Sequence, residues 1–223
     1  MKLGVIWFGN DLRCADQYIL WQAAQAVDYL VCLYCDEPHH KRPSRYATQG
    51  MSANRRKFLE DGLHGLAQQL KTIGQTLYVS QNDAVTSLTL LLNTLPISHI
   101  YRNHHSGWDE QQTLKQLTER FADVHVHIDH NVSLFEPSQL PFSISKLPDS
   151  FSKFYRLVES IEVDTPLPSL RTLPPVPNFD ILTIRPWQSK KIEENRAFTG
   201  GQRAASHQLS DYFSTCLPSF PLG

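Results

Sequence analysis

The stretch that decides the fold is the N-terminal run Lys2-Leu3-Gly4-Val5-Ile6-Trp7-Phe8, followed by the turn Gly9-Asn10-Asp11-Leu12-Arg13. The run has the length of a strand and is apolar on both faces, which is typical of the centre of a sheet that is covered on both sides. Gly9 and Asn10 then break the strand before a new apolar periodicity begins. Because ligands of open α/β sheets bind at the carboxyl ends of the strands, we expect the turn at the functional edge.

An alternation of strands and helices continues along the chain. Apolar or alternating runs predict four more strands, at residues 29–35, 76–80, 98–101 and 124–128. Helical spacing predicts helices between them, at 16–26, 53–72, 83–92 and 107–121, with N-caps at Asp16, Ser52 and Asp83. With right-handed crossovers, this order predicts an α/β fold: a Rossmann-like, doubly wound sheet of five parallel strands with helices on both faces.

The composition changes after Asn131. One helix is predicted from Ser150 to Glu159, and the proline-rich segment 164–187 is predicted to be an extended linker that runs over a surface. A last helix is expected from about Gln202 to Tyr212. We therefore divide the chain into an α/β domain at 1–132, a helix and proline-rich linker at 133–197, and a helical C-terminal segment at 198–223.

The length, the net charge and the number of cysteines exclude several classes of protein. A chain of 223 residues can bury one sizeable core. A net charge of −1 gives no overall attraction to nucleic acid or to an anionic membrane. Four cysteines are too few for a disulfide scaffold. Neither a signal peptide nor an apolar stretch that could span a bilayer is visible, so we expect a globular protein of the cytoplasm.

Five motifs, in order, resemble the photolyase and cryptochrome family. They are Trp7-Phe8-x-Asn10-Asp11-Leu12-Arg13, Leu33-Tyr34-Cys35-Asp36-Glu37-Pro38, the stretch from Met51 to Leu59, the stretch from Phe151 to Glu159, and the stretch from Phe198 to Phe213. The fourth motif is similar to the DASH-type cryptochromes. The resemblance implies the family's N-terminal α/β domain, which carries an antenna chromophore of folate or flavin type. It also implies that the helical domain, which holds FAD and carries out light-driven repair of DNA, is absent from this chain.

The chain departs from the family pattern at several positions. Gly9 stands where the family usually has an arginine, and Gln49 stands where a histidine often contacts the folate. Asp16-Gln17 replaces an Asp-Asn pair, and Trp108-Asp109-Glu110 opens the fourth helix. The identity of a chromophore therefore stays open.

The candidate site consists of residues at or near the carboxyl ends of the predicted strands. They are Phe8, Asn10, Tyr34, Asp36, Gln49, Met51, Arg55, Asn103, Trp108 and Asp109. In this hypothesis the aromatic rings stack on a planar ligand, Asp109 accepts hydrogen bonds from ring N–H groups, and Arg55 meets an anionic tail. No catalytic residue and no metal ligand is assigned. For Asp11 and Arg13 we favour structural roles, a helix cap and an ion pair, over contact with a ligand.

Two other patterns are interpreted as structural. Cys32 and Cys35 have a redox spacing, but an odd offset on a strand points them to opposite faces. His125 and His127 share a strand face and could chelate a metal, yet no cysteine or carboxylate follows at a metal-binding spacing. A basic cluster is formed by Arg42, Arg45, Arg55, Arg56 and Lys57. Such a cluster is more often a solvated surface than a contact to a phosphate, a folate tail or nucleic acid, and of its members only Arg55 is kept as a candidate ligand contact.

Three functions follow as expectations. The first is a non-catalytic, antenna-like domain that binds a planar chromophore, a nucleotide-like ligand or a protein partner. The second is a part of an FAD-dependent photolyase or DASH cryptochrome. The third is a dimerising protein without a ligand, whose contact is the C-terminal tail. The tail carries the apolar residues Phe198, Leu209, Tyr212, Phe213 and Phe220. Neither membrane binding nor direct binding of nucleic acid is expected.

Overall fold

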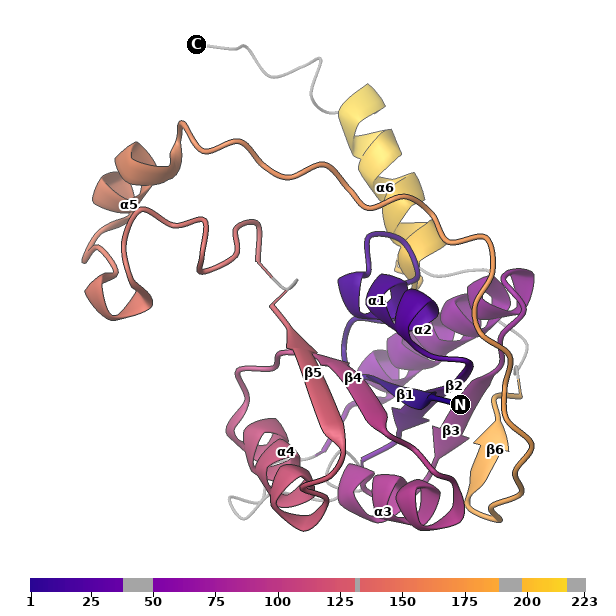
Figure 1. Cartoon of the computed structure of the whole chain (residues 1–223). Helices are drawn as coiled ribbons and strands as arrows, with labels where there is room; N and C mark the ends of the chain where they lie inside the picture. Colours follow the sequence, from indigo (N-terminus) through magenta and orange to yellow (C-terminus); the bar gives the residue numbers. More distant parts are fainter. Residues whose placement is uncertain (38–49, 131–132, 189–197, 216–223) are drawn as a thin grey trace.

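The computed structural model describes residues 1–37, 50–130, 133–188 and 198–215. Its centre is a sheet whose strands lie in the order β5-β4-β1-β2-β3-β6 (Figure 1). The strands are β1 (Leu3–Phe8), β2 (Tyr29–Cys35), β3 (Leu77–Ser80), β4 (His99–Asn103), β5 (His125–Asp129) and β6 (Ile184–Pro186). The first five pair in parallel, which confirms the predicted doubly wound sheet.

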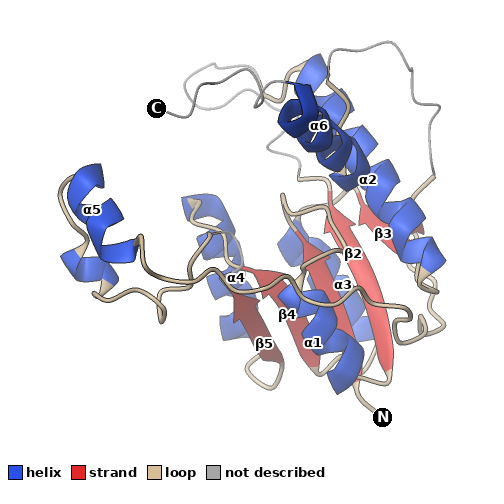
Figure 2. Ribbon diagram, turned by 90° about the horizontal axis from the view of Figure 1, so that it is seen from above, coloured by secondary structure: helices blue, strands red, loops and turns tan. Residues whose placement is uncertain are grey.

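Helices cover both faces of the sheet (Figure 2). Helices α1 (Tyr18–Ala26) and α2 (Ala53–Thr72) cover one face, and α3 (Ala84–Thr94) and α4 (Trp108–Arg120) cover the other. Helices α5 (Phe151–Val158) and α6 (Gln202–Thr215) follow, with a short 3-10 turn at Ile144–Lys146 before α5. Two of the three predicted N-caps are confirmed. Ser52 accepts a hydrogen bond from the Arg55 amide, and Asp83 accepts one from the Thr86 amide, so each satisfies a free N–H of the first turn.

The predicted cap at Asp16 is wrong. Helix α1 begins after Gln17, and Asp16 lies outside it with a φ of 48°, in the left-handed region that aspartate tolerates better than most residues. Its carboxylate instead accepts a hydrogen bond from the Leu167 amide at 3.0 Å, which ties the β1–α1 loop to the proline-rich segment. A tertiary contact has therefore replaced the local one that the sequence suggested.

The core consists of two apolar clusters, one on each side of the sheet. Ile6 and Phe8 pack with α1 and α2, whereas Val5 and Trp7 pack with α3 and α4. The same alternation places Cys32 in the first cluster and Cys35 in the second, as predicted for an odd offset. Burial raises the pKa of both thiols, which favours the unreactive protonated form.

The proline-rich segment packs against the α/β domain and adds a sixth strand, which we did not predict. Strand β6 pairs antiparallel with β3, and Ile184 is buried. Before β6 in the same segment, Pro175 accepts a hydrogen bond from the Leu30 amide at 3.0 Å, and Leu173 joins the core. Proline lacks a backbone donor, but an edge strand needs donors on one side only, so a strand that ends at Pro186 is compatible with this position.

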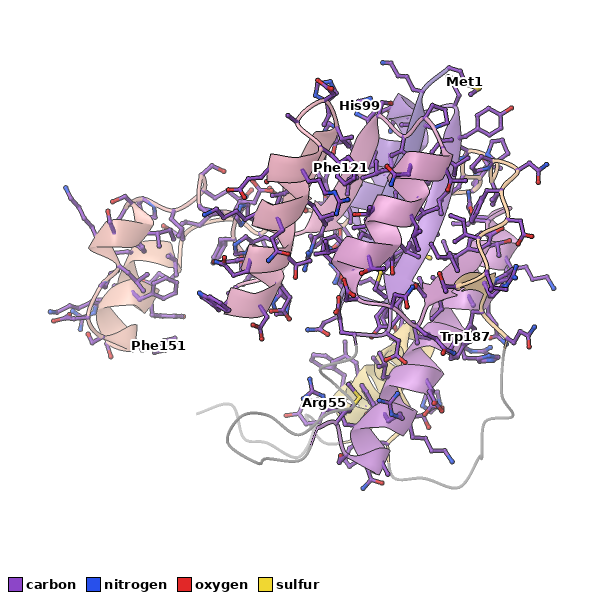
Figure 3. All side chains as sticks on the ribbon, turned by 90° about the horizontal axis from the view of Figure 1, so that it is seen from below. Met1, Arg55, His99, Phe121, Phe151 and Trp187 are labelled. Atoms are coloured by element: carbon purple, nitrogen blue, oxygen red, sulfur yellow. The ribbon has the colours of Figure 1, made fainter. Side chains whose placement is uncertain are left out.

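The two last helices differ in how they pack. Helix α5 stands away from the sheet, and Phe151 at its start is 77% exposed (Figure 3). Helix α6 packs on α2, and Gly200 lies so close to that helix that a Cβ there would overlap the carbonyl oxygen of Phe58. None of the helices in the described residues combines the length and the apolar character needed to cross a bilayer.

Candidate functional site

The sheet has one topological switch point, between β1 and β4. The chain builds β2 and β3 on one side of β1, and then returns to build β4 and β5 on the other. In sheets of this kind a crevice opens at the carboxyl ends of the strands at the switch point. A cavity of about 210 Å³, which we call the first cavity, lies there. Its walls come from the ends of β1, β2 and β4, the loops after them, and the starts of α2 and α4.

A second cavity of about 440 Å³ adjoins the first on the side of α2 and α6. Its apolar wall includes Leu12, Met51 and Phe58. Asn10, Tyr34 and Arg55 line both cavities and so form a shared wall. Figure 3 shows Arg55 near the start of α2, beside the end of α6. A ligand longer than one ring system could therefore extend from one cavity toward the other.

Asp11 holds the turn beside this wall. Its carboxylate accepts hydrogen bonds from the Gly9 amide at 3.1 Å, from the Gln17 side chain at 2.8 Å, and from the Asn103 side chain. Asn103 also donates to Gln17 at 2.7 Å. The network joins the end of β1, the start of α1 and the end of β4. Asp11 thus has a structural role, as expected, but it holds a loop and does not cap a helix.

Six of the predicted site residues lie around the two cavities. Phe8, Asn10, Tyr34, Arg55 and Asp109 line the first, and Met51 lines the second. Burial, assisted by the nearby carboxylate of Asp36, raises the pKa of the Tyr34 phenol, which therefore stays a hydrogen-bond donor.

The other predicted site residues lie elsewhere. Asn103 is buried in the Asp11 network, and the Asp36 carboxylate lies 3.7 Å from the Arg56 guanidinium. Trp108 is the first residue of α4, but its side chain is 72% exposed. Gln49 lies outside the described residues. Trp108 belongs to neither cavity lining, because the first turn of α4 presents Asp109 and Glu110 to the first cavity.

Several wall residues of the first cavity escaped the sequence analysis as candidates, among them Trp7, Arg102 and Glu110. The guanidinium carbon of Arg102 lies 3.5 Å from the centroid of the Trp7 ring, and only 5% of Arg102 is exposed. Glu110 lies 3.5 Å from His105, whose other ring nitrogen contacts Asn10 at 3.0 Å. A signal existed, since an arginine within the short apolar strand Ile100-Tyr101-Arg102 departs from the pattern of a buried strand.

The histidines form a separate cluster on β4 and β5. The Nδ1 atom of His99 lies 2.9 Å from the Nε2 atom of His127, and the His127 ring stacks on Tyr101. Burial and neighbouring histidines lower the pKa of His99 and His127, so the neutral rings are favoured. Within the described parts of the chain, no three histidine, cysteine or acidic side chains converge in a way that could hold a metal ion.

Comparison with known proteins agrees with this architecture. The sequence profile of the family described as DNA photolyase matches residues 4–175. The chain belongs to the DNA photolyase family. Among curated relatives, this photolyase-family chain is 33% identical to a Cryptochrome DASH of Idiomarina loihiensis, and the match covers 96% of this chain and 47% of that protein. It is 32% identical to a Cryptochrome DASH of Vibrio parahaemolyticus, with 98% and 49% covered.

Solved structures of the photolyase family share the fold. A cryptochrome from Synechocystis superposes with a TM-score of 0.86 at 24% identity, and the match covers 96% of this chain and 46% of that one. A photolyase from Sulfolobus tokodaii, described as holding two FAD molecules, gives a TM-score of 0.70 at 21% identity over 93% and 46%. The chain spans about half the length of the curated relatives that it matches.

Proposed function

We propose that this chain is an antenna-like domain that binds a planar chromophore, or a nucleotide-like ligand, at the switch point of its sheet. The observation that carries the proposal is the pair of adjoining cavities with the shared wall of Asn10, Tyr34 and Arg55. The first cavity has more charged side chains in its wall, and the second has more apolar ones. This combination suits a ligand with a polar heterocycle at one end.

The chemistry of the wall supports a binding role. Asp109 is a hydrogen-bond acceptor for ring N–H groups, and Arg55 is a donor for an anionic or carbonyl group. The structure of the Sulfolobus tokodaii relative is described as implying a novel light-harvesting cofactor. A light-harvesting role for this chain is the corresponding proposal here, and it requires no catalytic residue in the site.

The test is a spectrum of the purified chain across the near-ultraviolet and visible range, as isolated and after incubation with folates and flavins. Retention of a chromophore after gel filtration, with one ligand per chain determined by mass spectrometry, is the expected result. Spectra that show only the absorption of the protein under all of these conditions would overturn the proposal.

A matched pair of variants locates the site. Arg55 and Arg56 are neighbours at the start of α2, but Arg55 lines both cavities, whereas Arg56 lines neither and pairs with Asp36. Arg55→Gln is expected to weaken chromophore binding about tenfold, the loss of one charge-assisted hydrogen bond, and Arg56→Gln to leave it within about twofold. The opposite ranking would place the ligand elsewhere.

A second candidate function is self-association through α6. Leu209, Tyr212 and Phe213 on this helix are 58%, 48% and 56% exposed, which is unusual for three large apolar side chains within one helix. Two copies of the chain could bury these faces against each other. Sedimentation velocity over a wide range of concentration tests this. A dimer that Tyr212→Ser dissociates supports it, and a monomer at every concentration removes it.

The second expected function, a part of an FAD-dependent photolyase or cryptochrome, is compatible with the same site. In that case the ligand at the switch point would transfer its excitation energy to an FAD held by the family's helical domain, and this chain would contribute light harvesting alone. The test adds this chain, with its chromophore bound, to an FAD-binding helical domain of the family. Faster DNA repair or flavin reduction at the wavelengths that the chromophore absorbs would support this role. No enhancement would count against it.

A further inference from the structure

Strand β5 is an open edge of the sheet. It stands first in the strand order and pairs with β4, and among the residues that the structure describes no strand lies on its other side (Figure 2). Its sequence is His125-Val126-His127-Ile128-Asp129, without the lysine or proline with which natural proteins commonly block an edge. The opposite edge differs, because β6 has only three residues and ends at Pro186.

The backbone of β5 turns toward β4 at alternate residues. The His125 amide donates a hydrogen bond to the Ser98 carbonyl at 2.9 Å, and the Asp129 carbonyl accepts one from the His104 amide at 2.7 Å. Because the direction of the backbone groups alternates along a strand, the groups of His127, midway between these two residues, turn toward β4 as well.

Val126 and Ile128, the two residues between them, turn their N–H and C=O groups outward from the sheet. The edge therefore presents two donors and two acceptors in the spacing that another strand would pair with. The side chains of both residues are apolar and lie on the same face of the sheet. Ile128 is 43% exposed, and within the described part of the chain neither side chain belongs to the two apolar clusters of the core. An incoming strand would thus gain backbone hydrogen bonds and apolar contact together.

The sequence of β5 is complementary to itself in an antiparallel register. With a twofold axis through His127, His125 lies opposite Asp129 of a second copy, which sets an imidazole beside a carboxylate. In the same register Val126 lies opposite Ile128 of that copy, which sets two apolar side chains together. Because Val126 and Ile128 turn their backbone groups outward, each such pair exchanges two backbone hydrogen bonds, and the axis generates the pair twice. This complementarity favours a second copy over an unrelated strand.

We propose that the chain forms a dimer in which the β5 strands of two copies pair antiparallel, so that two six-stranded sheets join into one. The contact is independent of chromophore binding, because none of the described residues of β5 lines either cavity. It is also distinct from a contact through α6. Since it consists of a few backbone hydrogen bonds and side-chain pairs, the interface is small and the dimer is weak.

The test is sedimentation velocity of the full chain at concentrations up to about 1 mM, where a weak dimer is populated. Ile128→Lys places a charge in the apolar pair, and Val126→Pro removes an outward N–H that β4 does not use. Each is expected to raise the dissociation constant at least about tenfold. The matched control is Ile144→Lys, the same substitution at an isoleucine that is 58% exposed outside the sheet, and it is expected to change the constant by less than about twofold. The same holds for Tyr212→Ser on α6.

Hydrogen exchange on the wild-type chain decides the question even if a variant does not fold. The amides of Val126 and Ile128 should exchange at least about tenfold more slowly in the dimer than in dilute monomer. The His125 amide is the internal control, because its hydrogen bond to Ser98 protects it in both states.

Three results would overturn the inference. A monomer at every concentration removes the dimer. A dimer that Ile128→Lys leaves intact, or that does not slow exchange at Val126 and Ile128, has its contact elsewhere. A dimer that Tyr212→Ser dissociates and Ile128→Lys does not is held by α6.

Discussion

Replacing Asp11 with asparagine exchanges one carboxylate oxygen for an amide nitrogen. We expect this substitution to lower the free energy of unfolding more than any other isosteric substitution in the β1–α1 turn. The carboxylate accepts hydrogen bonds from the side chains of Gln17 and Asn103, which are 2% and 6% exposed. Both donate to the same oxygen, Oδ2, whereas the Gly9 amide donates to Oδ1, so an asparagine amide nitrogen would face either the Gly9 amide or both side-chain donors. Hydrogen bonds to charged groups contribute about 1.5–3 kcal/mol each, so the loss should reach about 3 kcal/mol, allowing for the bond that Asn103 keeps to Gln17. For a chain of this size that corresponds to a fall of about 6–12 °C in Tm.

Urea unfolding followed by circular dichroism measures this loss, provided that the slope of the transition is unchanged. Asp28→Asn is the control. Asp28 also accepts a short hydrogen bond, from the Lys2 amide at 2.6 Å, but its side chain is 61% exposed, and we expect a change below about 0.5 kcal/mol. If Asp11→Asn unfolds within about 1 kcal/mol of the wild type, the network does not stabilise the turn as argued.

Three further predictions concern other parts of the molecule. Gly200→Ala places a Cβ against the Phe58 carbonyl, so hydrogen exchange in α6 should accelerate at least about tenfold, and unchanged protection would contradict the close packing of α6 on α2. Because the folded state lowers the pKa of His99 and His127, the unfolded chain takes up protons first as the pH falls below about 6.5. Stability should therefore be lost below that pH, and the loss should be smaller in His127→Phe; equal losses in both proteins would argue against the cluster. Trp108→Ala should change the free energy of unfolding by less than about 0.5 kcal/mol and leave chromophore affinity intact, whereas an affinity loss above about threefold would bring this exposed ring into the site.

The parallel sheet could be predicted because local and global signals agree along most of the chain. Strands β1 and β2 are apolar on both faces, and Ser52 and Asp83 stand directly before apolar periodicities, where their side chains cap the next helix. Strand β6 could not be predicted. It has three residues and ends at a proline, and only its pairing with β3 makes it a strand.

The candidate site was predicted in outline. Strand ends give its position, so residues such as Phe8 and Tyr34 were found from their place in the chain. Sequence gives little information on where a side chain points from a helix start, and Trp108 and Asp109 are adjacent in sequence but differ in whether they face the first cavity. Arg102 was missed because its place in the wall depends on the stacking with Trp7, which is a property of the folded chain.

The return of the proline-rich segment to the sheet has a consequence for synthesis of the protein. Until the ribosome has released the chain past Trp187, whose amide donates to the Leu77 carbonyl, the outer edge of β3 has unpaired backbone groups. Such an edge is a template for pairing with another nascent chain. Because closing so long a loop is slow relative to the formation of local helices, the half-made domain passes through an aggregation-prone interval. Translation speed and chaperone supply over this interval, more than the final stability, should therefore govern the yield of folded protein.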